Sequence, residues 1–453
     1  MIFLLLVVWP IAMSGSAWLV RRTPLLATLT AAIATLVELV LLGRVALDDP
    51  ARLLGINVVV TATSQLTLGV LAVSVLVNLL SSAVFAQGEH VPAITLLLLG
   101  CGAAVAIFAA PLLATTVVLI AGGLAALLLL DTPTFTLISP ALLAAALRFL
   151  VLWVVGAALL FVGLLLQRPA ASPLATTLVV LGWAVLLGLF PFHLAFPPLA
   201  ATANVAVIGV IGGVLQLLGV LLVIALRPTQ LVADALAQQL LVAFGGLSVL
   251  GGALLALRAT PRRTIMLLLT ARLGLIAVAL GQPTEVGLRS ALALITTHAL
   301  ATALLVLGLA LGERRVAGRS ESVGILRERP LAAIACIAGL LTLLGLPPFG
   351  GWGPLLLLSQ ALSGSPVVLG CCALGLVIAA LAATRLIRDL LIRPPVVATT
   401  RTLAFDDVQL LPAAIPGYAP GLVRIALIVL LTASLALGLA PDLLFVPLNA
   451  AGR

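Results

Sequence analysis

Long apolar runs alternate with short polar connections along most of the chain. Because about 20 apolar residues are needed for a helix to cross a bilayer, each run predicts one transmembrane helix. The alternating segments of about ten residues that mark a membrane β-barrel are not seen. The pattern predicts an all-α polytopic membrane protein with about fourteen spans, near 2–20, 25–43, 62–85, 92–109, 112–130, 141–166, 173–195, 203–226, 237–257, 263–281, 288–311, 331–350, 366–389 and 421–441.

The connections divide the predicted spans into three parts. Residues 1–91 hold spans one to three, 92–390 form a core of spans four to thirteen, and 391–453 hold a surface loop and the last span. The first run lacks a basic segment before it and is followed by Arg21, so we interpret it as a retained span rather than a signal peptide. In the surface loop, Phe405, Val408 and Leu411 predict one face of a short helix lying on the membrane.

Prolines interrupt two of the predicted spans. Pro191 and Pro197 flank His193 in the seventh span, and Pro347 and Pro348 lie in the twelfth. A proline inside a helix removes an N–H donor and frees a carbonyl that hydrocarbon cannot satisfy. The two breaks lie five spans apart, which predicts two inverted five-helix repeats, spans four to eight and nine to thirteen, with corresponding broken helices.

Composition and charge exclude a soluble protein and predict an orientation. The chain is 63% hydrophobic and only 8% charged, and its 23 basic residues, all arginine, give a net charge of +9. Arginines concentrate in the loops after odd-numbered spans, above all in 312–330. The positive-inside rule therefore predicts that both termini face the outer side of the cell (inner) membrane. We attribute the basic charge to orientation and lipid headgroups rather than to nucleic acid.

The sequence contains no motif for a bound cofactor. Its four cysteines lie in apolar runs without C-x-x-C spacing, and neither G-x-G-x-x-G nor a P-loop lysine is present. We therefore expect no metal, no cofactor and no redox centre on this chain. Any redox chemistry must belong to partner subunits.

Five stretches resemble one family of membrane proteins. They are P-F-H-x3-P from Pro191, THALATALLVLG at 297–308, GLPPFGGW at 345–352, LRFLVLWVVGAALLFVG from Leu147 and PRRTIMLLLTARLG from Pro261. In this order and spacing they resemble the antiporter-like membrane subunits of respiratory complex I, a module shared with Mrp-type sodium/proton antiporters and membrane-bound hydrogenases. The resemblance covers roughly residues 60–390.

The resemblance implies a relay of buried ionisable residues, and this chain departs from it. At the positions of the family's lysines in spans seven, eight, eleven and twelve stand Leu186, Leu217, Thr302 and, approximately, Leu355. The span-five glutamate has no counterpart, while Arg148 stands at the span-six lysine and Arg272 replaces a histidine. Arginine keeps its proton, so Arg148 is expected to hold water or an anion, or to pair with Asp131, rather than to relay.

A reduced proton pathway is the candidate site, formed by His193, His298, Thr302, Gln216 and Arg148. Each member also has a structural interpretation. His193 can donate to carbonyls freed by Pro197 and Pro198, and His298 with Thr302, one helical turn apart, can make a neutral hydrogen bond between helices. Outside this pathway, Arg272 is expected to extend toward the cytoplasmic interface, and Glu38 to face lipid or another subunit.

The resemblance favours one function and leaves two alternatives open. It predicts a non-catalytic, antiporter-like membrane-arm subunit of a complex I-type NADH:quinone oxidoreductase, associated with proton translocation coupled to electron transport and quinone chemistry. Its partners would be other membrane subunits, the lipid bilayer and protons or sodium, without nucleic acid. The alternatives are a degenerate scaffold subunit that does not conduct, and a stand-alone ion or solute transporter, because fold alone does not fix function.

Overall fold

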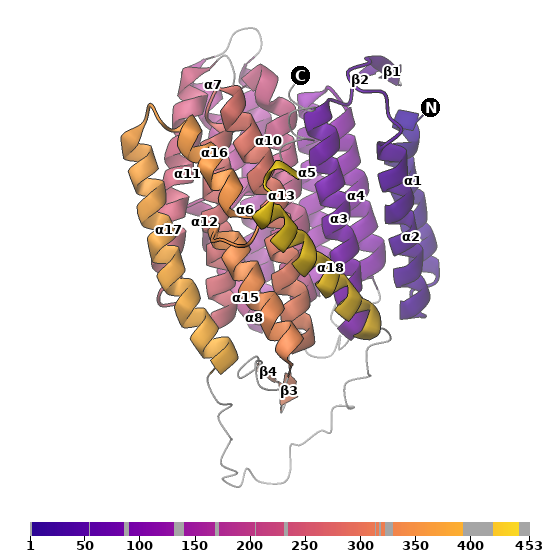
Figure 1. The fold of residues 1–453 in the computed structure, drawn as a ribbon. Coiled ribbons are helices and arrows are strands. Elements are labelled where there is room, and N and C mark those ends of the chain that lie inside the picture. The colour runs from indigo at the N-terminus through magenta and orange to yellow at the C-terminus, as the bar shows by residue number, and fades with distance from the viewer. Residues whose placement is uncertain are drawn as a thin grey trace.

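A computed structural model describes residues 2–53, 55–85, 90–130, 140–167, 172–203, 205–230, 234–312, 314–316, 319–321, 329–392 and 420–443. Its helices stand side by side in one bundle, with α1 and α2 at one edge, α17 at the opposite edge and α18 crossing obliquely in front (Figure 1). The predicted domain boundaries at 91 and 390 stay predictions. The predicted surface helix around Phe405 lies outside the described residues.

The chain is nearly all helical, as predicted, and a helix lies at each predicted span. Several of the helices begin at a proline, a residue that fits the first helical turn because no N–H is needed there. The long helices are α1 (Ile2–Leu19), α2 (Pro24–Leu42), α3 (Ala62–Phe85), α4 (Val91–Ile107), α5 (Pro111–Leu130), α6 (Pro140–Leu166), α7 (Pro173–Leu186), α10 (Gln216–Gln230), α11 (Ala235–Ala256), α12 (Pro261–Leu280), α13 (Glu285–Gly312), α15 (Pro330–Leu344), α17 (Pro366–Ile387) and α18 (Pro420–Leu439). Shorter helical segments are η1 (Phe192–Ala195), α8 (Phe196–Thr202), α9 (Val205–Gly209), η2 (Val210–Leu215), α16 (Trp352–Ala361) and η3 (Arg388–Ile392).

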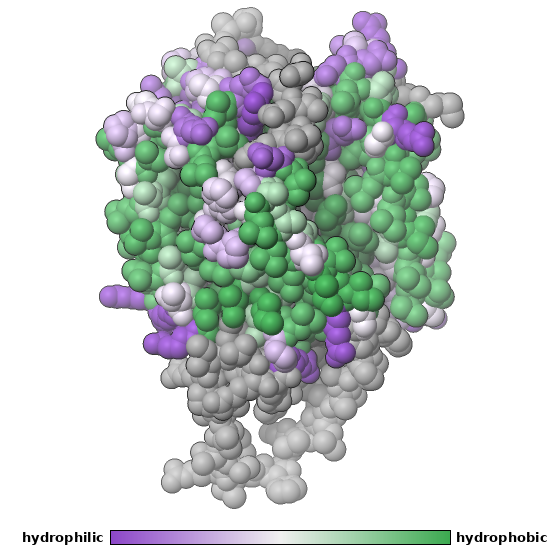
Figure 2. Space-filling model, viewed as in Figure 1, coloured by the Kyte–Doolittle hydropathy of each residue, from purple (hydrophilic) through white to green (hydrophobic). Residues whose placement is uncertain are grey.

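The helices form an apolar belt of membrane thickness. Eleven helical stretches of the described chain are long and apolar enough to span a bilayer, and α4, α7 and α15 are shorter apolar helices. Figure 2 shows hydrophobic side chains across the middle of the visible face and hydrophilic ones mainly toward its two ends. The protein is therefore an integral membrane protein, while the count of fourteen spans stays a prediction.

Two small hairpins depart from the expectation of a purely helical chain. Strands β1 (Ala51–Leu53) and β2 (Ile56–Val58) pair antiparallel between α2 and α3, and β3 (Arg314–Val316) pairs with β4 (Arg319–Glu321) after α13. The two hairpins lie at opposite ends of the bundle (Figure 1). Three-residue strands in polar connections give no periodic hydrophobic signal, so the sequence pattern missed them.

The centre of the bundle is formed by α10, α12 and α13. In α12 and α13, 94% and 89% of the apolar stretch is buried, against 22% in α1 and α18. The central helices therefore face other helices on all sides, whereas the outer ones expose apolar residues such as Val40, Val151 and Val367. A polar site at the centre of the bundle therefore has to involve α10, α12 and α13, together with α3, which packs against α10 and α13.

The seventh predicted span is broken, as expected from Pro191. Helix α7 ends at Leu186, and Gly188 adopts a left-handed conformation with φ 63°. The Gly188 N–H donates to the Val185 carbonyl at 3.1 Å, and the Leu189 N–H to the Ala184 carbonyl at 2.8 Å. This pair of bonds is a Schellman motif, which satisfies carbonyls at a helix end without water.

The twelfth predicted span breaks in the same way. Helix α15 ends at Leu344, Gly345 has φ 71°, and its N–H donates to the Thr342 carbonyl at 3.2 Å. The Leu346 N–H then donates to the Leu341 carbonyl at 2.9 Å, as in the other break. The two breaks share one hydrogen-bond pattern, which supports the predicted correspondence of spans seven and twelve. The inverted-repeat relation of the two halves stays a prediction.

The eighth span contains an irregularity that the sequence analysis did not anticipate. Between α9 and α10 the backbone widens into the π-helical segment η2, whose residues are all buried. A π-helix bonds each N–H to the fifth carbonyl back, so the regular ladder is interrupted where it begins. The interruption leaves carbonyls at the centre of the bundle that need donors from other helices.

Candidate functional site

His298 supplies one of these donors. It lies in the middle of α13 with its side chain fully buried, and its Nε2 is 3.1 Å from the carbonyl oxygen of Gly212 in η2. Since a carbonyl only accepts, Nε2 carries the proton and donates. The histidine therefore links α13 to the irregular backbone of the eighth span.

Three more polar side chains surround the same segment. Asn78 of α3 donates from Nδ2 to the Gly209 carbonyl at 3.2 Å. Thr302, one turn after His298, donates to the His298 carbonyl at 2.8 Å, and its methyl carbon lies 3.3 Å from the position a Cβ would take at Gly213. Gln216 follows η2 directly, with Oε1 3.8 Å from the Cβ position of Gly212. We call Asn78, Gln216, His298 and Thr302 the central polar cluster.

The cluster has more hydrogen-bonding capacity than its members use. Asn78 Oδ1, His298 Nδ1 and both amide atoms of Gln216 are buried and have no hydrogen-bond partner among the described residues. A buried polar group without a partner costs roughly 1–3 kcal/mol. Sites of this kind bind ordered water, which needs two to four polar partners. The arrangement therefore offers four unsatisfied polar atoms at the centre of a membrane protein.

Arg272 lies next to the cluster and carries a permanent charge. Its side chain is 1% exposed, and Nη2 donates to Thr297 Oγ1 at 2.7 Å, one residue before His298 on α13. The expectation that Arg272 reaches the cytoplasmic interface is wrong, because the guanidinium group points into the helix bundle. A cation at this depth is costly in an apolar interior and usually marks a functional position. We therefore include Arg272 in the candidate site.

His193 is buried at the break in the seventh span, outside the central polar cluster. Its ring stacks on Phe190 with centroids 5.2 Å apart, and the Phe190 N–H donates to Ser248 Oγ of α11 at 2.8 Å. The backbone group that His193 contacts is Pro191, and the described hydrogen bonds do not include the expected donation to the carbonyls freed by Pro197 and Pro198. Both prolines lie in the first turn of α8, a position that tolerates proline.

Arg148 and Glu38 lie where the sequence analysis did not expect them. Arg148 is exposed on α6, away from the central polar cluster, and its suggested partner Asp131 lies outside the described residues. Glu38 is fully buried in α2, with neither carboxylate oxygen hydrogen-bonded within the described chain, so the expectation that it faces lipid or another subunit is wrong. A helix has several faces, and spacing along the sequence does not tell which face meets the bundle.

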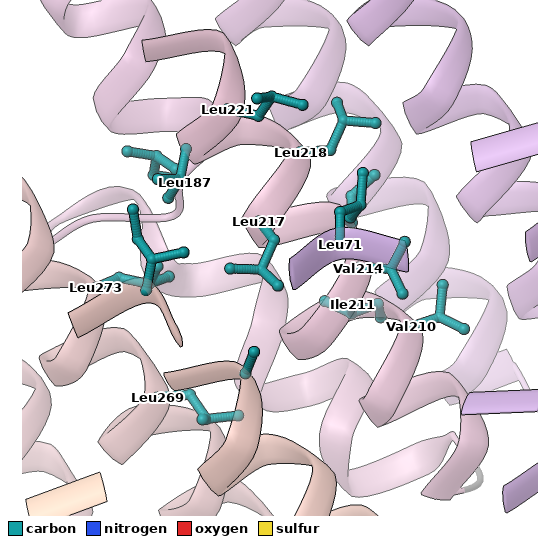
Figure 3. Packing of buried hydrophobic residues seen from close by; sticks show 14 of the residues in the cluster. Leu71, Leu187, Val210, Ile211, Val214, Leu217, Leu218, Leu221, Leu269 and Leu273 are labelled. Carbon is teal, nitrogen blue, oxygen red and sulfur yellow. The ribbon is translucent and has the colours of Figure 1, made fainter. Parts of the chain in front are cut away.

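The positions at which the resemblance implies lysines are apolar in three dimensions as well. Leu217 is fully buried and Figure 3 shows it among Leu187, Leu269 and Leu273. Leu186 is 1% exposed, and Leu355 packs against Gly345 at the second break. These leucines leave no room for a charged group without a change in packing. Thr302 is the only one of the four positions that joins the polar cluster.

Asn78 and the π-helix are the parts of the site that the sequence analysis missed. Asn78 is a carboxamide inside an apolar run, and Gly209, Gly212 and Gly213 make the start of the eighth span rich in glycine. Both signals are visible in the sequence. They become meaningful only together, since Asn78 contacts Gly209 across 131 positions of the chain. Among the described residues, no group of His, Cys, Asp and Glu could hold a metal ion.

A family described as NADH:quinone oxidoreductase/Mrp antiporter, TM, matches residues 125–381. Among curated proteins no sequence relative matches the chain.

Solved structures share the whole fold at low sequence identity. A chain of the membrane-bound sulfane sulfur reductase, an archaeal respiratory membrane complex, is 18% identical with a TM-score of 0.79, covering 99% of this chain and 96% of that one. A chain of the Mrp complex from Dietzia sp. DQ12-45-1b gives the same values. A chain of respiratory complex I from Thermus thermophilus is 21% identical with a TM-score of 0.76, covering 98% of both chains.

Proposed function

Because the chain belongs to the NADH:quinone oxidoreductase/Mrp antiporter transmembrane family, we propose that it is an antiporter-like membrane subunit of a complex I-type NADH:quinone oxidoreductase. In this proposal the assembly couples electron transport to proton translocation, and other subunits carry the redox centres and the quinone site. The partners of this chain are other membrane subunits and the lipid bilayer. The transported ion is the proton, with sodium as the alternative that the family allows.

The central polar cluster is the observation that carries the proposal. Polar groups at membrane depth are expensive and usually mark a pathway. Here two carboxamides, an imidazole and a hydroxyl meet around a π-helix. With Nε2 of His298 bonded to the Gly212 carbonyl, Nδ1 is left to exchange a proton with bound water. The imidazole is the one group of this cluster that can both accept and donate a proton through its two ring nitrogens.

The second candidate is a subunit of the same assembly that does not conduct. It is favoured by the apolar packing at Leu186 and Leu217, which interrupts the chain of ionisable groups between the seventh and eighth spans. His193, which lies at the break near Leu186, has no described contact with His298. In this case the fold serves assembly and the cluster only stabilises the eighth span.

Proton-to-electron stoichiometry separates the two candidates. The tagged chain is purified with its co-purifying subunits, reconstituted in liposomes and given NADH and a quinone. The His298→Leu variant should lower the stoichiometry while the rate of electron transfer stays at the parent value, because no redox centre is expected on this chain. Thr296→Val is the matched control, since the Thr296 hydroxyl bonds only to its own helix at Leu292.

The other outcomes select the alternatives. Unchanged stoichiometry in His298→Leu, and in the double variant that also carries His193→Leu, would favour the non-conducting subunit. A chain that purifies alone and carries ions without any electron donor would instead favour a stand-alone transporter.

A further inference from the structure

Arg272 is the one arginine among the described residues whose side chain is buried within the bundle. Nη2 is held by Thr297, whereas Nε and Nη1 have no hydrogen-bond partner in the described part of the chain. The described ion pairs do not include it. A buried cation in a helical membrane protein requires compensating negative potential from its surroundings.

The broken end of α15 lies on the other side of a small cavity. This cavity is lined by Arg272 from α12, by Leu343 and Leu344 at the end of α15, and by residues of α11 and α17 that include Val249 and Gly375. Its volume of about 10 Å³ is close to the minimum that can hold a single water molecule. Arg272 and the end of the broken helix therefore line the same small cavity.

The sequence removes the helical donors of the last carbonyls of α15. In a continuous helix the Leu343 and Leu344 carbonyls would accept from the N–H groups four residues on, but Pro347 and Pro348 stand there and have none. The Schellman bonds of Gly345 and Leu346 reach only Thr342 and Leu341. Since the C-terminal end of a helix also carries a partial negative charge, this break attracts a cation.

Open helix ends of this kind coordinate mobile cations in transporters. In this chain a cation is already attached to the neighbouring helix, and a guanidinium group does not give up its proton under ordinary conditions. We propose that Arg272, which lines the same small cavity as the broken end of α15, is a tethered cation whose charge closes this half of the chain to protons and other small cations. The inference deepens the proposed function, because it confines proton handling to the central polar cluster and the first half.

The first break differs in this respect, which makes the arrangement specific to α15. At the end of α7 the freed groups meet Ser248 and the stacked rings of Phe190 and His193. The described residues place no buried arginine there. The two breaks thus share a backbone pattern but differ in charge, and only the second is compensated by a fixed cation.

Passive proton entry into liposomes tests the proposal without any electron donor. The full chain, with the subunits that co-purify, is reconstituted and a potassium diffusion potential drives protons toward a pH-sensitive dye inside. Two unit charges a few ångströms apart in a protein repel by enough to change ion occupancy on the order of 100-fold. We therefore expect Arg272→Gln and Arg272→Met to raise proton entry by at least about tenfold, and Arg272→Lys to keep the parent rate.

The controls separate charge from packing. Thr297→Val removes the hydrogen bond of the guanidinium group but keeps its charge, so proton entry should stay within about twofold of the parent. Equal proton entry in the parent and both neutral variants would overturn the proposal. An equal increase in Arg272→Lys would also overturn it, because the cause would then be altered packing.

The expression levels of the Arg272 variants give a further outcome. If both neutral variants fail to accumulate while Arg272→Lys accumulates normally, the charge acts in folding and the proposal is overturned. Failure of the proposed function would show separately, as absence of NADH-driven proton uptake by the parent assembly. The passive assay remains interpretable in that case.

Discussion

At the scale of single residues, buried polar groups lie where the backbone of a neighbouring helix is irregular. His298 donates to Gly212, Asn78 to Gly209 and the Phe190 N–H to Ser248. Hydrocarbon cannot satisfy a freed backbone group, so a side chain or amide from another helix has to do so. The same contacts fix the helices relative to one another and create the polar cluster.

Gly209 provides a test of the contact with Asn78. A Cβ at Gly209 would lie 2.0 Å from Asn78 Oδ1, which is closer than two non-bonded atoms can approach. Gly209→Ala should therefore lower the stability of the purified chain by about 1–3 kcal/mol, measured by thermal unfolding in detergent. In the double variant with Asn78→Ala the loss should be smaller, since the obstructing group is gone.

Gly123 supplies the control for this measurement. It lies in α5 and has nothing within 4 Å of its Cβ position, so Gly123→Ala should leave the unfolding temperature unchanged or slightly higher. Equal stability of Gly209→Ala and the parent would show that Asn78 does not pack against the eighth span.

At the scale of elements, glycines let helices approach until their backbones touch. A Cβ at Gly274 of α12 would lie 2.6 Å from the Gly245 carbonyl oxygen of α11, and a Cβ at Gly245 would lie 2.7 Å from the Gly274 carbonyl oxygen. Close packing of this kind drives association of helices in lipid, where burial of apolar surface gives no gain. The glycine content of the spans therefore has a structural role.

Replacement of Gly274 should separate α11 from α12. Because the obstruction is backbone rather than a flexible side chain, Gly274→Ala is expected to cost about 1–3 kcal/mol in thermal unfolding. Gly246, next to Gly245 but with nothing within 4 Å of its Cβ position, is the matched control, and Gly246→Ala should not destabilise the chain. A neutral Gly274→Ala would mean that the two helices can part without loss.

At the scale of the whole molecule, the two hairpins mark the two ends of the bundle. The β1–β2 hairpin and the β3–β4 hairpin lie at opposite ends (Figure 1). This relative placement agrees with the predicted order of crossings. Which end faces the cytoplasm stays a prediction from the distribution of arginines.

Single cysteines introduced into the two hairpins test the orientation. In a variant without the four native cysteines, Arg315→Cys should react with an impermeant maleimide only from the cytoplasmic side, and Arg52→Cys only from the outside. The reverse result would invert the topology. Reaction of both from one side would contradict the arrangement of the helices itself.

The sequence by itself determined the class of the molecule and the places where its helices break. Apolar runs of about 20 residues can only be buried in lipid as helices, because hydrocarbon offers no partners for the backbone. Pro191 and the pair Pro347 and Pro348 lack the N–H groups that a continuous helix needs. These properties depend on neighbours in the sequence and are therefore readable from it.

Only the tertiary structure decided which polar residues meet. His298, Asn78 and Gln216 lie on three different helices, and the face that each presents depends on how those helices pack. For the same reason Arg148 is exposed, Glu38 is buried, and Arg272 is bonded to Thr297 beside the cavity at the broken end of α15 rather than extended to the membrane surface. Apolar residues surround most of these spans on all sides, so periodicity could not select the inward face.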